Sequence, residues 1–264
     1  MRADIEHMKQ VVLEAGKLFG DRKSAGEIYI KGAADYVTQV DVTVQQFVSR
    51  RLGELYPDIQ FMGEEQSNAG IDLDGQVWVL DPVDGTTNLI HDYQTSAVSL
   101  ALLENREPVF GIVYNPFHQE LFWAEKGKGC FLNGRQVFVS KAERPENSMI
   151  TIGTSPYYKE LAEENFQLFQ HIFLNFQDIR RSGSAALDLA YVACGRTEAY
   201  LERRLKIWDF AAGVLLVKEA GGMVLDYTGN PLQMGLTADL VAGNGVIPQI
   251  LVGEYIQRRK GIGR

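Results

Sequence analysis

The chain has 264 residues, of which 45% are hydrophobic, and its formal net charge is -8 at pH 7. That length and apolar content are enough to bury a sizeable core, either in one large α/β domain or in two lobes. The negative charge argues against a nucleic-acid partner or an anionic membrane surface, because such a chain repels phosphate groups at long range.

Cysteine usage and hydropathy indicate the compartment. Cys130 and Cys194 are the only cysteines, and they lie far apart without a CxxC motif, so we expect no disulfide framework and no zinc site. Residues 1–10 lack the apolar stretch of a signal peptide, and no window approaches the roughly 20 apolar residues of a membrane span. We therefore expect a cytoplasmic protein that does not enter a membrane.

The first half of the chain predicts a pair of helices followed by an antiparallel meander. Apolar residues at helical spacing predict one helix over residues 5–19 and a second over residues 42–57. Asp41 lies where the N-cap of the second helix is expected. Three strands and then a glycine-rich hairpin follow: residues 96–104, 108–115, 120–125 and 126–134.

The second half alternates strands with helices. The predicted strands are residues 149–154, 176–181, 197–202 and 223–226, and the predicted helices are residues 157–173, 183–195 and 208–222. This order predicts one catalytic domain over residues 1–264, an α/β sandwich of alternating helix and sheet layers. We expect two lobes in one compact unit, residues 1–145 and 146–264, with the seam near residues 144–147.

Residues 77–90, VWVLDPVDGTTNLI, place two aspartates directly after a buried apolar run. Asp81 and Asp84 are separated by a proline-stiffened turn, so both carboxylates are expected to point to one side. Two close carboxylates raise one another's pKa unless a cation lies between them, and Mg²⁺ prefers carboxylate and water oxygens as ligands. The alternative interpretation of this stretch is an ordinary turn with an aspartate N-cap.

A helix is predicted to begin directly behind these aspartates, at Gly85, Thr86 and Thr87. The first N–H groups of a helix have no partner within it, and the helix dipole is positive there, so this start can bind phosphate. A metal site and a phosphate site would then be adjacent.

Three further acids are available to complete such a site. Glu64 and Glu65 follow an apolar pair, and Asp209 begins a predicted helix after Trp208. Each also has an ordinary structural interpretation: a solvated loop pair for the two glutamates and a plain N-cap for Asp209.

Four of these motifs together resemble those of a known family. FMGEE (61–65), WVLDPVDGTTN (78–88), WDFAAG (208–213) and EAGG (219–222) match the inositol monophosphatase family in order and spacing. The likeness covers nearly the whole chain, and it departs only in details such as Tyr36 and Val83, neither of which replaces a side-chain ligand. It implies the sugar-phosphatase fold and a Mg²⁺-dependent, lithium-sensitive phosphoric monoester hydrolase that forms a homodimer.

The resemblance also implies roles for individual residues. The first metal would be held by Glu64, Asp81 and the carbonyl of Val83, and the second by Asp81, Asp84 and Asp209. A third, weaker ion would face Glu64, which gives two to three Mg²⁺ per active site. Thr86 would lie beside the attacking water, with Asp41 hydrogen-bonded to it, and the N–H groups of Gly85 and Thr86 would bind phosphate. The implied substrate contacts are Asp84, Gly183, Ser184, Ala185 and Glu202.

Two basic segments have no settled role. Arg203, Arg204 and Lys206 are either a solvated charged face or a site for a second substrate phosphate. Arg180 and Arg181 precede a helix of small residues, which is either a dimer surface or an ordinary strand-to-helix corner.

The leading functional prediction is an inositol-1-monophosphatase, which hydrolyses a phosphate monoester of inositol or a related polyol with a metal-activated water. Family members that act on fructose 1,6-bisphosphate, NADP, adenosine 3',5'-bisphosphate or histidinol phosphate are alternatives, although Glu202 seven residues before Asp209 is closer to the inositol pattern. A non-catalytic regulatory or binding module is a further alternative, and the complete set of acids argues against it.

Overall fold

Two β-sheets carry the fold, and the computed structural model describes residues 4–20, 25–32 and 35–258. The larger sheet has the strand order β3-β4-β5-β6-β7-β8-β9, in which β3 and β4 are parallel and every later pair is antiparallel. Its strands are β3 (Gln60–Gly63), β4 (Gln76–Asp84), β5 (Ala97–Glu104), β6 (Glu107–Asn115), β7 (Glu120–Glu125), β8 (Gly129–Leu132) and β9 (Arg135–Val137). The predicted meander and hairpin are therefore confirmed.

The smaller sheet has the strand order β11-β10-β12-β14-β13. Here β10 is parallel to β11 and β12, whereas β14 is antiparallel to β12 and β13. Its strands are β10 (Met149–Ile152), β11 (Asp178–Arg180), β12 (Ala199–Lys206), β13 (Met223–Asp226) and β14 (Thr237–Gly243). A separate hairpin of β1 (Ile28–Gly32) and β2 (Asp35–Thr38) precedes both sheets.

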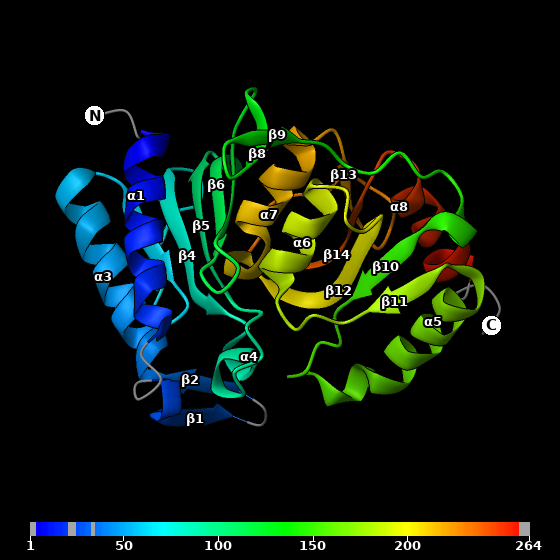
Figure 1. Ribbon diagram of the computed structural model, residues 1–264, viewed down its shortest axis with the longest axis horizontal. Helices are drawn as coiled ribbons and strands as arrows, with labels where there is room; N and C mark the ends of the chain where they lie inside the picture. The colour runs from blue at the N-terminus through cyan, green and yellow to red at the C-terminus, as the bar shows by residue number, and fades with distance from the viewer. Residues whose placement is uncertain (1–3, 21–24, 33–34, 259–264) are drawn as a thin grey trace.

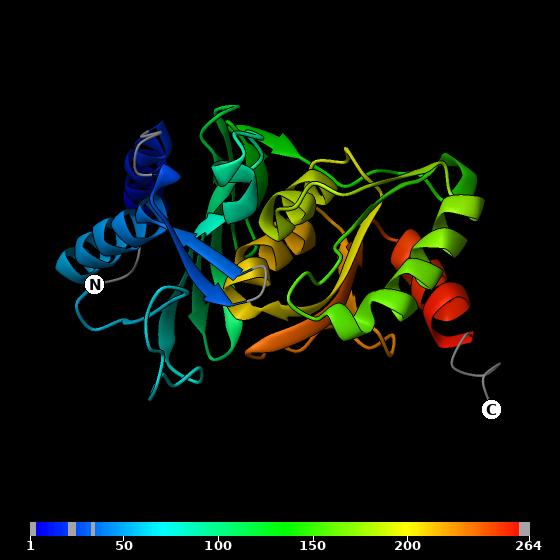
Figure 2. The same ribbon diagram turned by 90° about the horizontal axis from the view of Figure 1, so that it is seen from below.

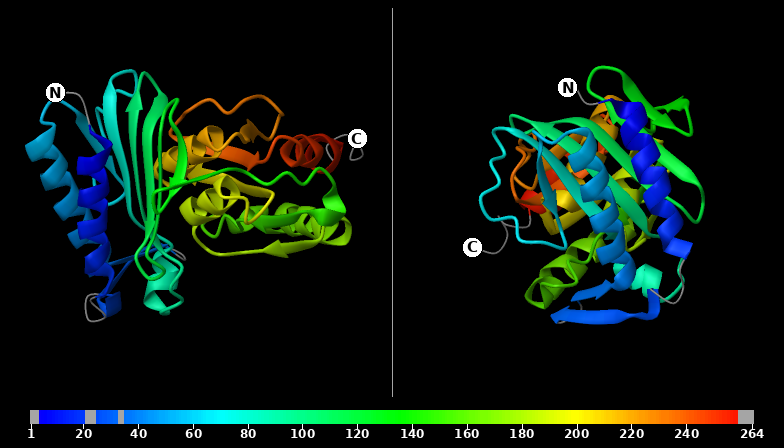
Figure 3. Two further views of the ribbon diagram at one scale, coloured as in Figure 1. Left: turned by 45° about the horizontal axis from the view of Figure 1, so that its top comes forward. Right: turned by 90° about the vertical axis from the view of Figure 1, so that its left-hand side faces the viewer.

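Helices form the other layers, as Figures 1 and 3 show. The outer face of the larger sheet is covered by α1 (Ile5–Gly16), its 3-10 extension η1 (Lys17–Gly20), and α3 (Gln39–Leu55). Between the two sheets lie α6 (Ala185–Ala193) and α7 (Ile207–Glu219). The far face of the smaller sheet is covered by α5 (Ala162–Asn175), α8 (Ile247–Ile250) and the π-helix η4 (Leu251–Gln257). The short elements are α4 (Thr86–Ile90), η2 (Pro145–Asn147) and η3 (Lys159–Leu161). This arrangement confirms the layered α/β sandwich.

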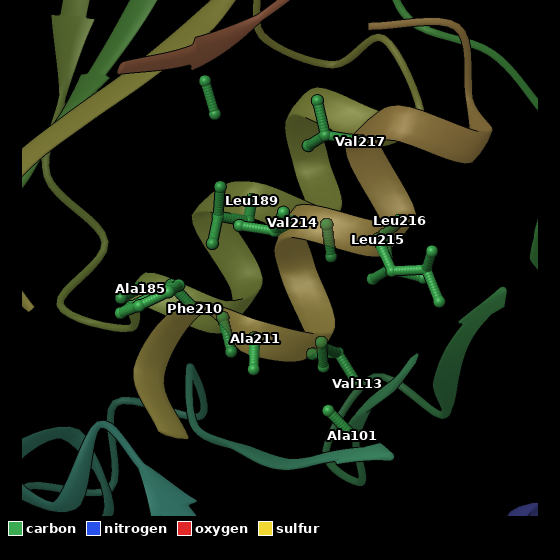
Figure 4. Close-up of a cluster of buried hydrophobic side chains, with 14 of the residues drawn as sticks. Ala101, Val113, Ala185, Leu189, Phe210, Ala211, Val214, Leu215, Leu216 and Val217 are labelled. Carbon is green, nitrogen blue, oxygen red and sulfur yellow. The ribbon is translucent and has the colours of Figure 1, made fainter. Parts of the chain in front are cut away.

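Each sheet is buried on both faces, which explains the continuous apolar runs of its strands. In β4, Val77 and Val79 face the α6–α7 layer, whereas Trp78 and Leu80 face α1 and α3. Figure 4 shows the middle layer, where side chains of α6 and α7 such as Leu189 and Val214 pack together above strands of the larger sheet. This packing fixes the start of α6 and the start of α7 against the end of β4, where the acidic motifs lie.

Several predicted boundaries were wrong. The second helix begins at Gln39, and its N-cap is Thr38 rather than Asp41, because the Thr38 hydroxyl accepts a hydrogen bond from the backbone N–H of Val40. The helix predicted over residues 157–173 begins only at Ala162, after a 3-10 turn. β14 had not been predicted. Among the described residues, no helix combines the length and apolar character that crossing a bilayer requires.

Candidate active site

A cavity of about 620 Å³ collects the predicted site residues from both halves of the chain. Figure 2, which views the molecule from below, brings forward β1, β2 and α4, near which β4 ends. Every residue to which the family resemblance assigned a role lines this cavity except Asp41, which is fully buried, and Glu65, the other acid considered, does not line it. The predicted residues that line it are Glu64, Asp81, Val83, Asp84, Gly85, Thr86, Gly183, Ser184, Ala185, Glu202 and Asp209.

The end of β4 carries the first two acids. The strand continues through Asp84, and its pairing with β5 shifts register between Asp81 and Asp84. Asp81 Oδ1 accepts a hydrogen bond from the backbone N–H of Val83 at 3.0 Å, and both aspartates are buried. Gly85 then turns the chain into α4 with a φ of +91°, a conformation that favours glycine.

The start of α6 binds Asp84. Ser184, the N-cap of α6, donates a hydrogen bond from its hydroxyl to Asp84 Oδ2. The backbone N–H groups of Ala185 and Ala186 donate to the same carboxylate, at 3.3 and 2.7 Å. The residues expected to contact substrate therefore hold a metal-ligand candidate in place.

Asp41 reaches the site through Thr86. As the third residue of α3, Asp41 accepts hydrogen bonds at Oδ2 from the N–H and the hydroxyl of Thr38, at 2.8 and 2.5 Å. Its Oδ1 accepts a hydrogen bond from the Thr86 hydroxyl at 2.9 Å. The hydroxyl of Thr86 also lies 3.1 Å from the carbonyl oxygen of Val83. With its proton directed away from the cavity, the Thr86 oxygen keeps lone pairs for a donor such as water.

The other two acids approach the same point from different elements. Glu64 directly follows β3, and its N–H donates to the carbonyl of Leu80 at 3.2 Å, which places it beside the end of β4. Asp209 is the third residue of α7, and its Oδ2 accepts a hydrogen bond from the N–H of Lys206 at 2.7 Å. Asp209 is therefore not the N-cap, because Lys206 occupies that position.

The electrostatics of this cluster disfavour ionisation. Burial raises the pKa of Asp81 well above its ordinary value, and the charges of Glu64, Asp84 and Asp209 raise it further. Burial is also the main cause that raises the pKa of Asp209, again with help from Asp84 and Glu64. The pKa of Asp84 rises to about 6, because burial outweighs the opposing effect of its hydrogen-bond donors. Like charges gathered in a buried site favour a cation among them.

The donor set fits a hard divalent cation. Four carboxylates and the carbonyl of Val83 are all oxygen ligands, the type that Mg²⁺ prefers. Within residues 4–20, 25–32 and 35–258, no three Asp, Glu, His or Cys side chains are close enough in their present rotamers to share one ion. Mg²⁺ usually keeps several waters and is held by only one or two carboxylates, so three converging side chains are not required.

The end of β12 also lines the cavity. Glu202 is buried there, and three basic residues follow it in the lining. Arg203 forms ion pairs with Glu164 and Asp239, at 2.6 and 3.4 Å. Arg204, with a φ of +60°, lies exposed at the cavity and over the ring of Tyr158. Of the three basic residues, Arg203 is therefore engaged in ion pairs within the protein. Arg204 and Lys206 line the cavity.

Several residues of the cavity wall were missed or differently interpreted from sequence, and three of them carry polar groups that bear on the site. Asp188 on α6 lines the cavity and is 2% exposed, and burial raises its pKa well above the ordinary value. An acid inside the otherwise apolar stretch AALDLA was the available signal. Arg181 also lines the cavity, so the corner before α6, predicted as a dimer surface or a simple turn, contributes to the site. Tyr158 had no sequence signal.

Comparisons with known proteins identify the family and support the fold. A model of the inositol monophosphatase family matches residues 3–262. The inositol-1-monophosphatase of Rhizobium meliloti is 38% identical and covers 95% of each chain, and the Nus factor SuhB of Xylella fastidiosa is 42% identical over 75% of this chain and 72% of its own. Among solved structures, the extragenic suppressor protein suhB of Bartonella henselae has a TM-score of 0.88 at 35% identity, covering 95% and 98% of the two chains. The Thermotoga maritima IMPase has a TM-score of 0.86 at 30% identity, covering 98% and 99%.

Proposed function

The chain belongs to the inositol monophosphatase family and is a phosphoric monoester hydrolase, and we propose that it hydrolyses the phosphate monoester of inositol or a related polyol with the help of Mg²⁺. One observation carries this proposal: Glu64, Asp81, Asp84 and Asp209 line a single cavity next to Thr86. Bound Mg²⁺ would lower the pKa of a water and stabilise negative charge on the phosphate oxygens. We assign the first ion to Glu64, Asp81 and the carbonyl of Val83, and the second to Asp81, Asp84 and Asp209.

The protein's own groups position the reactants. Thr86 directs its proton to Asp41, so its oxygen can accept a hydrogen bond from the attacking water and orient it toward phosphorus. The N–H groups of Gly85 and Thr86, at the start of α4, would donate to the phosphate oxygens. Ser184 and the first N–H groups of α6 hold Asp84 in position, and Glu202 on the cavity wall accepts hydrogen bonds from substrate hydroxyls.

The test is phosphate release from a panel of substrates at millimolar Mg²⁺. The panel contains inositol 1-phosphate, fructose 1,6-bisphosphate, histidinol phosphate, adenosine 3',5'-bisphosphate and NADP. We expect the highest kcat/KM for inositol 1-phosphate. A bisphosphate preferred by orders of magnitude would replace the inositol assignment.

A second phosphate on the substrate is the other candidate that the site supports. Arg204 and Lys206 line the cavity together with Arg181, and Arg204 forms no ion pair with the residues that the structure describes. Guanidinium and ammonium groups that line the same cavity as the acids can neutralise a phosphate distal to the reacting one. Arg204→Ala should then lower kcat/KM for fructose 1,6-bisphosphate about tenfold and leave inositol 1-phosphate unchanged.

A binding role without turnover is the lesser alternative. It is supported by relatives that carry the name Nus factor SuhB and not the name of an enzyme. The complete acid set and the Thr86–Asp41 hydrogen bond support catalysis instead.

Both cysteines are free, which supports a reducing compartment such as the cytoplasm. A homodimer, expected from the family resemblance, can be tested by sedimentation at micromolar concentration.

A further inference from the structure

The carboxylate of Glu202, on the cavity wall, accepts hydrogen bonds from two donors. Its side chain lies on β12 and is only 9% exposed. The hydroxyl of Tyr200 donates to Glu202 Oε2 at 2.6 Å, and the backbone N–H of Ser155 donates to Oε1 at 2.7 Å. Residues two apart on a strand point to the same face, which is why Tyr200 and Glu202 can meet. Both carboxylate oxygens are thus fixed by separate elements.

Gly153 completes this arrangement by leaving room for the carboxylate. A Cβ atom at position 153 would lie 1.9 Å from both Cδ and Oε2 of Glu202, far inside van der Waals contact. The N–H of Gly153 donates to the carbonyl of Leu201 at 2.9 Å, which holds this segment against β12. The Glu202 carboxylate is therefore confined between Gly153, Tyr200 and Ser155.

The fixed position leaves acceptor capacity for a ligand. A carboxylate oxygen can accept two hydrogen bonds, so each oxygen of Glu202 keeps a lone pair after its contact with Tyr200 or Ser155. Glu202, Gly153 and Ser155 line the cavity, whereas Tyr200 is fully buried and is not part of the lining. The Tyr200 hydroxyl thus meets the cavity through Glu202, the lining residue to which it donates.

We propose that Tyr200 is a positioning residue that sets specificity for polyhydroxylated substrates, by holding the Glu202 carboxylate in the orientation that accepts hydrogen bonds from the substrate's hydroxyl groups. This inference rests on the proposed function, because it assumes that the polyol part of the substrate lies against Glu202. An acceptor held in place binds more tightly than a mobile one, since less conformational freedom is lost on binding. The Tyr200 hydroxyl acts on binding of the polyol and not on the phosphoryl transfer itself.

The test compares two substrates in the Tyr200→Phe variant. Inositol 1-phosphate presents hydroxyl groups to Glu202, whereas 4-nitrophenyl phosphate has none. We expect KM for inositol 1-phosphate to rise about fivefold to tenfold with kcat within about twofold of wild type, the pattern of lost ground-state binding. Both constants for 4-nitrophenyl phosphate should stay at the wild-type values. Glu202→Gln should raise KM for inositol 1-phosphate further than Tyr200→Phe does.

Tyr56→Phe is the matched control. Tyr56 is a buried tyrosine whose hydroxyl contacts the N–H of Asp4 and the ring of His7, away from the cavity. The Tyr56→Phe variant should lose about as much stability as Tyr200→Phe, and its KM for inositol 1-phosphate should not change. Gly153→Ala is a second test, because its Cβ would displace the Glu202 carboxylate from its present position. This variant should raise KM for inositol 1-phosphate but not for 4-nitrophenyl phosphate. It keeps the proposal testable if Tyr200→Phe does not fold.

The outcomes separate the two proposals. An unchanged KM for inositol 1-phosphate in Tyr200→Phe, or an equal rise in KM for both substrates, overturns the positioning role. The proposed function still stands in that case if the wild-type enzyme turns over inositol 1-phosphate. A wild-type enzyme that hydrolyses 4-nitrophenyl phosphate but not inositol 1-phosphate overturns the polyol substrate and the positioning role together.

Discussion

The hydroxyl of Thr86 donates a hydrogen bond to Asp41 at 2.9 Å, across 45 positions of the chain. This contact joins the first turn of α3 to the first residue of α4, and it orients a hydroxyl at the wall of the acidic cavity. Asp41 is itself fixed by Thr38, so the orientation of Thr86 is set by two linked hydrogen-bonded residues. Such pre-organisation aligns a water without requiring the threonine to lose a proton.

Removing the Thr86 hydroxyl should therefore slow turnover. We expect Thr86→Val to lower kcat about a hundredfold, the lower end of the range for a group that positions or transfers a proton. Thr86→Ser keeps the hydroxyl and should retain most of the activity. Steady-state kinetics on inositol 1-phosphate provide the measurement, and a Thr86→Val enzyme as active as Thr86→Ser would contradict the role.

The same pair predicts a pH dependence. Burial raises the pKa of Asp41 to about 6, against the opposing effect of its hydrogen bonds with Thr38 and Thr86. Above that pH Asp41 is ionised and accepts a strong hydrogen bond from the Thr86 hydroxyl, and below it Asp41 is protonated and is a weaker acceptor. At saturating Mg²⁺, kcat should be constant near pH 8 and fall as the pH drops through about 6. A profile that stays level down to pH 5 would be incompatible with this view.

Asp84→Asn should separate stability from activity. The pKa of Asp84 is raised from 3.8 to about 6, so its contribution to stability is full below about pH 4 and is lost as the pH rises through 6. At pH 7.5, in chelator, the neutral asparagine should stabilise the fold by roughly 1 kcal/mol, since relief of the buried charge exceeds the weakened bonds to α6. Activity should fall below detection because a metal ligand is lost.

Thermal denaturation in chelator and phosphate release with Mg²⁺ are the two measurements for this variant. Asp74→Asn is a suitable control, because Asp74 is exposed and pairs with Arg106 away from the cavity. An Asp84→Asn protein that unfolds, or one that turns over at a near-normal rate, would argue against the assignment.

Other cations should inhibit. Ca²⁺ should occupy the carboxylates, but its larger and irregular ligand shell misplaces the attacking water. Li⁺ should compete with Mg²⁺ for the third, weaker site that we expect at Glu64, and so delay product release. Phosphate release at fixed Mg²⁺ with added CaCl₂ or LiCl tests both, and NaCl at equal ionic strength is the control. Insensitivity to Li⁺ alone would remove only the third ion from the account.

Much of the site could be predicted because its residues are concentrated in short motifs. Asp81, Asp84 and Thr86 lie within six positions, so local geometry alone places them together. The alternation of buried strands and helices was equally visible, since the apolar runs of β4 and β12 are bounded by charged or glycine residues. Helix starts were less certain, because Thr38 and Asp41 are both suitable N-caps and only the structure shows which one accepts from Val40.

Other parts of the site depend on tertiary contacts that leave no local pattern. Tyr200 looks like any apolar residue of a strand, and its role is visible only from its contact with Glu202. Gly153 follows a strand in the same way that many turn glycines do, whereas the structure shows it beside a carboxylate. Arg181 and Asp188 come to the cavity because α6 packs against α7 between the two sheets.

The measurement that tests the central claim most directly is a Mg²⁺ titration of phosphate release from inositol 1-phosphate, starting from protein in excess chelator. Because Mg²⁺ gives up its hydration shell reluctantly and at least one ion is expected to bind partly through water, activity should be absent in chelator and rise into the millimolar range. The Asp209→Asn variant should need far more Mg²⁺ or remain inactive at any concentration. Full activity in excess chelator would contradict the account.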